Sequence, residues 1–169
     1  MRTRLVVLAG AVLLAACGED PQSVADLNPD FVVREEATDR GIVLVVETVS
    51  EGFSRSMDVT KLGLDMRRIA RFIATHPDKH PDVAGVRLEV TTPTVDVYGH
   101  DGMTRSLDLV MDRTTMERIN YDAIMTAAHF LNLTTPTVKH PVGRQLIAGY
   151  CEDETAQEYA RDFCRVARR

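Results

Sequence analysis

Two histidines stand close together in the chain, at a spacing that would suit a metal ion. His76 and His80 are four residues apart, and each is followed two residues later by an aspartate. On a helix, side chains at i and i+4 lie on the same face, so two imidazoles at this spacing can bind one ion. Pro77 and Pro81 follow them directly, and proline removes a backbone donor and breaks a helix. The sequence therefore predicts a solvated loop, with no metal ion and no cofactor.

The motifs of common catalytic sites are absent from the sequence. It contains no Gly-x-Ser-x-Gly, no phosphate-binding glycine loop and no His-Glu-x-x-His, the patterns that position a nucleophile, a phosphate or a zinc ion. The acidic pair Glu35-Glu36 and the acidic run Glu152–Glu154 are typical of solvated surface. We therefore expect no catalytic residues and a protein that is not an enzyme, with a periplasmic hydrolase as an alternative.

The amino-terminal residues have the pattern of an export signal. Arg2 and Arg4 precede the apolar run Leu5–Ala16, which would measure about 18 Å as a helix, too short for a hydrocarbon core of about 30 Å. A charged start and a short apolar run are typical of a signal peptide. The run ends in Leu14–Cys17 followed by Gly18, and this ending resembles the lipobox of bacterial lipoproteins.

The lipobox resemblance implies cleavage between Ala16 and Cys17 and a lipid anchor on Cys17. In this class the sulfur carries diacylglycerol and the new amino terminus is acylated, with palmitate as the expected fatty acid; several acyl chains together anchor a protein stably in a membrane. Gly18 in place of an aspartate implies the outer membrane, with the chain facing the periplasm. We therefore expect a signal peptide at 1–16, a lipid-anchored tether at 17–30 and one globular domain at 31–169.

Cys151 and Cys164 remain as a pair once Cys17 is assigned to lipid. In an oxidising compartment an even pair favours a structural disulfide. A helix beginning at Glu154 would place Cys164 about 15 Å along its axis, whereas a disulfide needs Cα atoms within about 7 Å. The pair can bond if the preceding segment folds back or if the helix begins near Gln157; two separate buried thiols are the alternative.

The net negative charge of the chain argues against a nucleic-acid partner. Removal of residues 1–16 takes away two arginines and no acid, so 18 basic and 25 acidic side chains remain, a net charge of −7. Binding to nucleic acid requires a concentration of basic side chains that neutralises phosphates. An acidic domain is also not attracted to anionic lipid. We expect no nucleic-acid partner, and contact with membrane lipid only through acylated Cys17.

The first half of the domain combines a β-hairpin with an amphipathic helix. Phe31–Ala37 and Ile42–Val49 are β-rich, and a Thr-Asp-Arg-Gly turn separates them. A helix is expected to begin at Asp58 or Thr60, because apolar residues then recur every three or four positions, and to end before Pro77.

Three further strands are expected, at Val86–Thr91, Thr94–Tyr98 and Met103–Met111. A capping-box pattern at Thr114 predicts a helix that ends near Asn132, and Glu154–Arg168 predicts a closing helix. The order is ββαβββα followed by a closing helix or helices. The sequence therefore predicts an α+β fold, with a mostly antiparallel sheet of about five strands and roughly two to four helices packed on one face.

An arginine-rich stretch on the first long helix is the clearest candidate for a binding surface. Arg67, Arg68 and Arg71 fall largely opposite the apolar stripe, on a protein that is otherwise acidic. A basic face on an acidic protein favours an acidic partner. The leading hypothesis is therefore a lipid-anchored periplasmic protein with a non-catalytic binding or assembly role, whose partner is another protein of the cell envelope.

A second resemblance suggests a different ligand. Ile69–Ile73, a proline-containing loop and then Val95–Asp101 resemble the helix–strand–Gly-His passage of OmpA-like domains, which bind peptidoglycan. The match covers a small part of the chain, and the residues after Asp101 read as another strand without the Asn and Ser-x-x-Arg positions of that family. The resemblance implies a peptidoglycan-binding lipoprotein, with His100 and Asp101 near the ligand.

Overall fold

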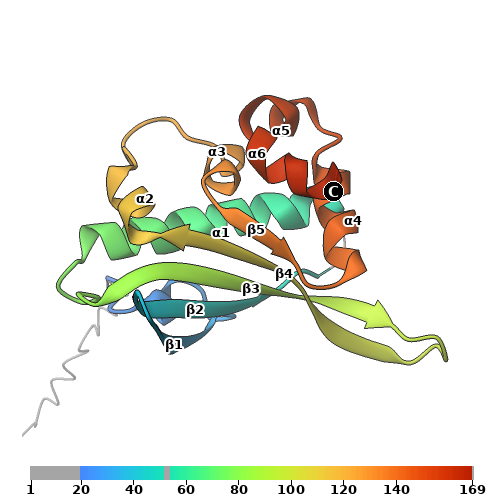
Figure 1. Ribbon diagram of the computed structural model, residues 1–169, viewed down its shortest axis with the longest axis horizontal. Coiled ribbons are helices and arrows are strands. Elements are labelled where there is room, and N and C mark those ends of the chain that lie inside the picture. Colours follow the sequence, from blue (N-terminus) through green and yellow to red (C-terminus); the bar gives the residue numbers. More distant parts are fainter. Residues whose placement is uncertain (1–19, 52–53, 169) are drawn as a thin grey trace, which may run out of the picture.

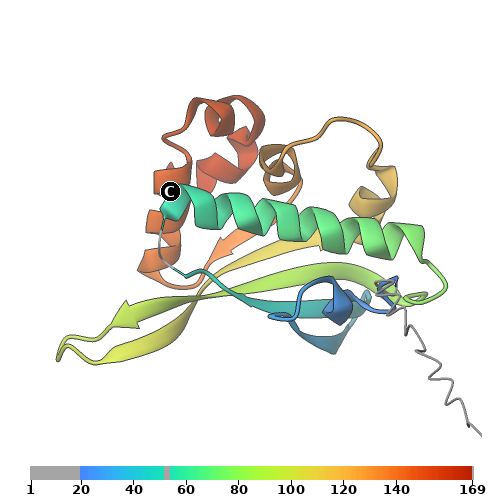
Figure 2. The ribbon, with the colours of Figure 1, turned by 180° about the vertical axis from the view of Figure 1, so that it is seen from behind.

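The computed structural model describes residues 20–51 and 54–168 of the chain. These residues form two layers, a single β-sheet and a set of helices that cover one of its faces (Figure 1). No helix of these described residues covers the other face of the sheet (Figure 2). The expected fold class is therefore confirmed: the protein is α+β, with one five-stranded, mostly antiparallel sheet and its helices on one side.

The five strands lie side by side in the order in which they occur along the chain. They are β1 (Val32–Thr38), β2 (Gly41–Val49), β3 (Val83–Val95), β4 (Asp101–Asp112) and β5 (Thr135–Val138). Neighbouring strands are antiparallel except β2 and β3, which are parallel. A parallel pair needs a crossover connection, and the first long helix supplies it.

The described residues contain six α-helices and two short 3-10 helices. The α-helices are α1 (Arg55–Thr75), α2 (Arg113–Arg118), α3 (Ala127–Asn132), α4 (Pro141–Tyr150), α5 (Glu154–Tyr159) and α6 (Arg161–Cys164). The 3-10 helices are η1 (Val24–Leu27) and η2 (Arg165–Arg168). Helix α1 lies lengthwise along the covered face of the sheet, and the smaller helices pack around it (Figure 2).

Helix α1 begins earlier than its apolar stripe suggests. The Ser54 side chain accepts a hydrogen bond from the Met57 backbone N–H at 3.5 Å and caps the first turn. Serine at this position satisfies a donor that would otherwise have no partner, so the helix extends three residues before the expected start at Asp58. It ends at Thr75 as predicted, because Pro77 follows the C-cap residue His76.

The core lies between α1 and the covered face of the sheet. Alternate residues of β3 and β4 point into it and are fully buried, namely Val86, Leu88, Val90, Leu107, Leu109 and Met111. Phe130 on α3 and Phe163 on α6 are also fully buried and belong to the same cluster. The two-residue period of the strands and the 3.6-residue period of α1 therefore meet in one apolar layer.

The division of the sheet into strands differs from the expected order. The run at 86–91 and the first two residues of the run at 94–98 belong to one strand, β3, although Thr92-Pro93 suggested a break. Residues 96–98, expected in a strand, lie in the turn that follows β3. The fifth strand is β5, which contains Pro136 and pairs with β4 at the edge of the sheet. Proline is tolerated on a strand whose N–H side faces no neighbour, so the rule that proline ends a strand fails at both places.

The expected helix at 114–132 is two helices, α2 and α3. Ile119 has an extended backbone and ends α2. The Tyr121 hydroxyl then donates to the Met116 carbonyl at 3.0 Å, a carbonyl that continued helix would have used. The Tyr121 ring stacks on Phe130, with centroids 6.3 Å apart; burial raises the pKa of Tyr121 to about 12. The contacts of Tyr121 therefore stabilise a non-helical segment where the middle of the helix was expected.

The closing helix is also interrupted, and the interruption allows the predicted disulfide. Ala160 separates α5 from α6, so the chain turns back toward the end of α4. Cys151 and Cys164 are bonded, with Cα atoms 5.7 Å apart, and the two-thiol alternative is excluded. A bond that closes a loop of this length contributes about 2–3 kcal/mol to stability.

The amino-terminal end of the described chain packs against the domain. Val24 in η1 is buried and belongs to the core cluster, so part of the stretch expected as a tether is packed. The signal peptide, the cleavage position Ala16 and the lipidation position Cys17 lie outside the described residues. In the described part of the chain, no helix is both long and apolar enough to cross a membrane.

A glycine lets α4 approach the sheet closely. A Cβ at Gly143 would lie 2.1 Å from the Ser106 carbonyl oxygen on β4, so no larger residue fits without a shift of the backbone. The same oxygen accepts hydrogen bonds from the backbone N–H groups of Lys139 and His140, at 2.9 and 3.2 Å. The start of α4 is thus held against β4 at the point where the sheet ends and β3 and β4 continue alone (Figure 1).

Candidate functional site

The three arginines of the expected binding face on α1 do not lie together on one surface. Arg67 points inward: its guanidinium donates to the Met125 carbonyl at 3.4 Å and lies 5.8 Å from the centre of the Phe130 ring. Arg68 is exposed, and its guanidinium lies 3.8 Å from the Asp65 carboxylate. Arg71 is exposed. Arg67 thus fixes the segment between α2 and α3, which leaves Arg68 and Arg71 of the predicted face on the outside.

Asp65 is a buried acid on the same helix. Its side chain is about 1% exposed, and its Oδ2 atom has no hydrogen-bond partner. Burial raises the pKa of Asp65, while the charges of Lys61 and Arg68, each 3.8 Å away, lower it by less. A charged carboxylate in this position is only partly compensated, so Asp65 destabilises the folded chain when it is ionised.

We expect Asp65→Asn to stabilise the protein at neutral pH. Since the folded state raises the pKa of Asp65 above 3.8, its favourable contribution is complete in acid and is lost as the pH rises through the folded-state pKa. The gain in unfolding free energy of Asp65→Asn over wild type should therefore increase from acid to neutral pH, in urea titrations at several pH values. The exposed Asp122→Asn is the control; an equal gain at every pH would contradict this account.

The two histidines near the end of α1 have structural partners. His76 stacks on Phe72 with ring centroids 4.5 Å apart, and His80 meets the same ring edge-on at 5.8 Å. Burial lowers the pKa of His80, which keeps the ring neutral at neutral pH. The loop is also held by Arg113, which donates to the His80 carbonyl at 2.5 Å. These contacts position the loop between α1 and β3, the position in which the sequence predicted it.

The described residues contain no group of three or more His, Cys, Asp or Glu side chains that could hold a metal ion. The hollows on the described surface are open and of modest size. One of about 380 Å³ lies beside α2 and is lined by Thr115, Arg118, Ile119, Asn120, Met125 and Leu133. Three of these side chains are apolar, two are polar and one is charged; no nucleophile and base are in contact among them, so this hollow offers no catalytic arrangement.

The uncovered face of the sheet carries an alternating network of charges. Glu89 on β3 is 5% exposed and accepts hydrogen bonds or ion pairs from Arg34 at 2.9 Å, from Arg87 at 2.9 Å and from Arg105 at 2.8 Å. The network continues to Glu36, Glu47, Asp108 and Lys139. Four basic and four acidic side chains thus balance within this face. This open face is therefore polar and internally paired, as expected for a solvated side of a sheet.

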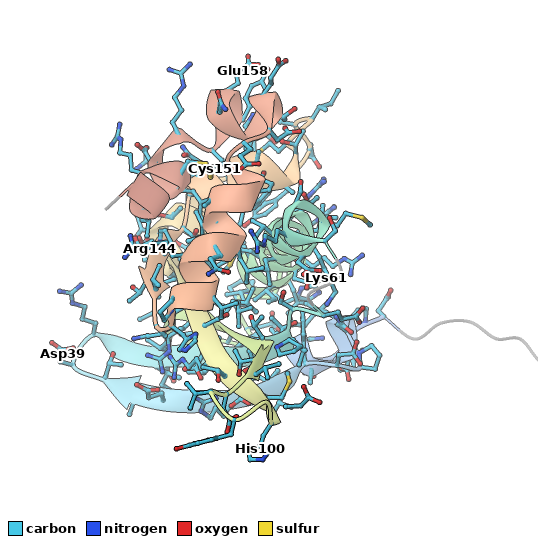
Figure 3. The ribbon with its side chains drawn as sticks, turned by 90° about the vertical axis from the view of Figure 1, so that its right-hand side faces the viewer. Asp39, Lys61, His100, Arg144, Cys151 and Glu158 are labelled. Carbon is cyan, nitrogen blue, oxygen red and sulfur yellow. A yellow bond between two sulfur atoms is a disulfide. The ribbon has the colours of Figure 1, made fainter. Side chains whose placement is uncertain are left out.

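The most prominent surface feature is the two-stranded extension of β3 and β4, residues 91–105, which we call the arm. Strand β2 pairs with β3 only as far as Thr91, and β5 pairs with β4 only from Leu107. Beyond these points β3 and β4 pair with each other alone and project from the body of the protein (Figure 1). Figure 3, viewed along the arm, shows His100 at its end and the sheet and helix layers behind it.

The two faces of the arm differ in chemistry. Pro93 lies opposite Met103, and Val95 lies opposite Asp101, so these four side chains share one face. They line an open hollow of about 400 Å³. The other face is a ladder of hydroxyls in which Thr94 and Thr104 are hydrogen-bonded at 2.9 Å. One face of the arm therefore carries Pro93, Val95 and Met103 together with Asp101, and the other carries hydroxyl groups.

Apolar side chains on the arm are unusually exposed. The exposed fractions are 65% for Val95, 55% for Met103, 93% for Val97 and 83% for Tyr98. Single exposed apolar residues are ordinary on a protein surface, whereas a group of them on one projecting element marks an interaction site. The arm is therefore the candidate functional site of this protein.

The tip of the arm is a well-formed turn. Asp96 accepts hydrogen bonds from the backbone N–H groups of Tyr98 and His100, at 2.8 and 2.9 Å, and its other oxygen meets the His100 ring at 3.1 Å. The backbone N–H of His100 is the main cause of a lowered Asp96 pKa. Gly99 has a φ of +85°, a conformation that glycine adopts without strain. The Gly-His pair noted in the sequence thus serves the turn.

The sequence predicts a turn at Gly99–Gly102, a few residues later than the actual turn at Asp96–His100, and it does not predict the arm as a surface. The signal was present: Val95, Val97 and Tyr98 place apolar side chains beside a four-residue turn that contains two glycines. Apolar residues next to a turn are ordinarily strand residues that point into a core. Only the ends of β2 and β5 reveal that no core lies beneath them.

Comparisons of the chain with protein families, with curated proteins and with solved structures found no match.

Proposed function

We propose that this protein is a lipid-anchored periplasmic protein of the cell envelope that acts by binding another protein, and that the arm is its docking element. The single observation that carries the proposal is the group of exposed apolar side chains on a projecting hairpin. Exposing these side chains opposes folding in water, and a two-stranded ribbon is marginal by itself. A binding partner that covers the arm accounts for both features.

The chemistry of the arm suits a protein partner. Val95, Val97, Tyr98 and Met103 provide apolar and aromatic contacts, and tyrosine and methionine are enriched at protein interfaces. A tyrosine supplies a large rigid ring together with a hydroxyl group that can bond at the rim of an interface. Non-catalytic binding through such a surface agrees with the absence of catalytic motifs in the sequence.

The position of the arm also suits an anchored protein. The described chain starts at one end of the longest axis, near η1, and the arm forms the other end (Figure 1). If Cys17 carries lipid, the anchor joins the domain at the end opposite the arm. The apolar tip would then lie far from the anchor, where a protein of the envelope can reach it.

One experiment in intact cells tests both parts of this proposal. With a photo-crosslinking amino acid at Val97 of the full-length chain, we expect protein adducts in the membrane fraction. The same amino acid at Ile124, which is fully exposed and apolar but lies outside the arm, should give several-fold fewer. Cys17→Ser should move the chain out of the membrane fraction. Equal adducts at Val97 and Ile124 would contradict docking by the arm, and membrane retention of Cys17→Ser would contradict the lipid anchor.

A further inference from the structure

The two edges of the arm present unpaired backbone groups, and the hairpin register shows which residues present them. The Asp96 N–H donates to the His100 carbonyl at 3.0 Å. In an antiparallel pair, hydrogen-bonded and non-hydrogen-bonded pairs alternate. The pairs Pro93–Met103 and Val95–Asp101 are therefore non-hydrogen-bonded, and their N–H and C=O groups point outward.

The two edges are not equivalent. On β3 the outward positions include Pro93 and Val95; Pro93 has no N–H to donate, and a proline at such a place protects an edge from strand pairing. On β4 the outward positions are Asp101, Met103 and Arg105, and all three can donate and accept. Strand β5 pairs only from Leu107, and the backbone N–H groups of Lys139 and His140 reach only as far as the Ser106 carbonyl, so among the described residues no strand lies beside β4 from Asp101 to Arg105. The β4 edge is therefore the side of the arm that is open to an added strand.

The β4 edge is complementary to itself. If two copies of this edge pair antiparallel about a twofold axis at Met103, Asp101 of each copy lies opposite Arg105 of the other. The two methionines meet at the axis, on the same face as these charges. All three outward positions then form hydrogen-bonded pairs, because residues that point outward face each other in this register. Opposite charges, apolar contact and hydrogen bonding thus agree in one register.

We propose that the β4 edge at Asp101–Arg105 pairs with the same edge of a second copy, so that one continuous sheet runs through a symmetric dimer. This inference rests on the proposed function, since it names a second copy of the chain as the partner of the arm. The interface is isologous, with the same surface used by both copies. It brings the exposed Met103 side chains together and removes the unpaired edge of β4 from water.

A cysteine at the axis tests the pairing directly. Residues that face each other in a hydrogen-bonded antiparallel pair have Cα atoms about 5.5 Å apart, within the range of a disulfide. Met103→Cys in the full-length chain, oxidised in membranes, should give a disulfide-linked dimer as the main species on a non-reducing gel. Tyr98 is more exposed than Met103, at 83% against 55%, but the two copies of this position lie more than about 20 Å apart in the dimer, so Tyr98→Cys should give at least tenfold less dimer.

Charge reversal tests the register. In a chain with Asp101→Arg two basic groups would face each other in the dimer, and with Arg105→Asp two acidic groups would. Each change, combined with Met103→Cys, should reduce the linked dimer several-fold. Co-expression of the two charge variants should restore it, because opposite charges then face each other. Restoration also shows that Arg105→Asp folds, although Arg105 contacts Glu89 and Asp108.

The outcomes separate this inference from the proposed function. Linked dimer from Met103→Cys, lost and restored by the charge variants, supports the second copy as partner. If Met103→Cys gives no more dimer than Tyr98→Cys while the photo-crosslinker at Val97 captures other proteins, the dimer is overturned and docking by the arm stands. If Met103→Cys gives no linked dimer and the photo-crosslinker at Val97 gives no protein adduct, both proposals are overturned.

Discussion

Phe130→Ala is expected to lower the unfolding free energy by about 3–5 kcal/mol, the usual cost of removing a fully buried phenylalanine ring. Phe130 is 0% exposed and lies in the core cluster. Its ring stacks on Tyr121, and the Arg67 guanidinium lies over it at 5.8 Å. The substitution therefore leaves a cavity and also removes the ring that holds the segment between α2 and α3.

Urea denaturation followed by circular dichroism measures this effect. Val97→Ala is a suitable control, because that side chain is 93% exposed and surface changes are usually within about 0.5 kcal/mol. Arg67→Met tests the contact from the other side, with an expected loss of about 1 kcal/mol from the cation–π contact. A Phe130→Ala protein as stable as wild type would show that α3 does not close the core.

Glu89→Ala is expected to be the most disruptive change on the uncovered face of the sheet. Three arginines meet the Glu89 carboxylate within 3 Å, and its side chain is 6% exposed. Removal of one partner from a buried ion pair costs about 3–5 kcal/mol, because the remaining charges lose their compensation. Since the arginines are 21–42% exposed, water screens part of this loss, and we expect about 2–3 kcal/mol.

The same network provides the control for Glu89. Glu47 also pairs with Arg34, but its side chain is 46% exposed, and exposed pairs contribute at most about 1 kcal/mol. Thermal or urea unfolding of Glu89→Ala and Glu47→Ala should therefore differ by more than about 1 kcal/mol. Equal losses would show that burial of Glu89 does not control the energy of the network.

Contacts of this charge network hold the base of the arm. Arg105 contacts Glu89 and Asp108 at the base of the arm, and Lys139 joins Asp108 from the segment after β5. These contacts hold β4 in place where β5 leaves it. In the proposed dimer Arg105 also faces Asp101 of the second copy, so the residue that fixes the base of the arm would also define the register of pairing.

Local sequence patterns were sufficient for the elements that face a core. The three- and four-residue recurrence of Val59, Leu62, Met66 and Ile69 identified α1, and Pro77 located its end. Alternation and turn residues identified β1 and β2. The physical reason is that burial on one face imposes a period on the sequence, and this period is visible without knowledge of the partner element.

Proline misled the sequence interpretation where a strand has a free side. Pro93 suggested a break between two strands and Pro136 obscured β5, because a central strand cannot lose a backbone donor. Both residues lie where no neighbouring strand needs the missing N–H group. Which side of a strand is free depends on where β2 and β5 end, and no local pattern contains that information.

The candidate site, too, has features that the sequence predicts and features that only the tertiary structure shows. The sequence by itself determined the fold class and the pairing of Cys151 with Cys164 as the favoured disulfide. Only the tertiary structure decided that Arg67 is held inside and that Val95 and Met103 lie on a projecting arm. The reason is that exposure is set by what packs against a residue, and the neighbours of Val95 are defined by where distant strands stop.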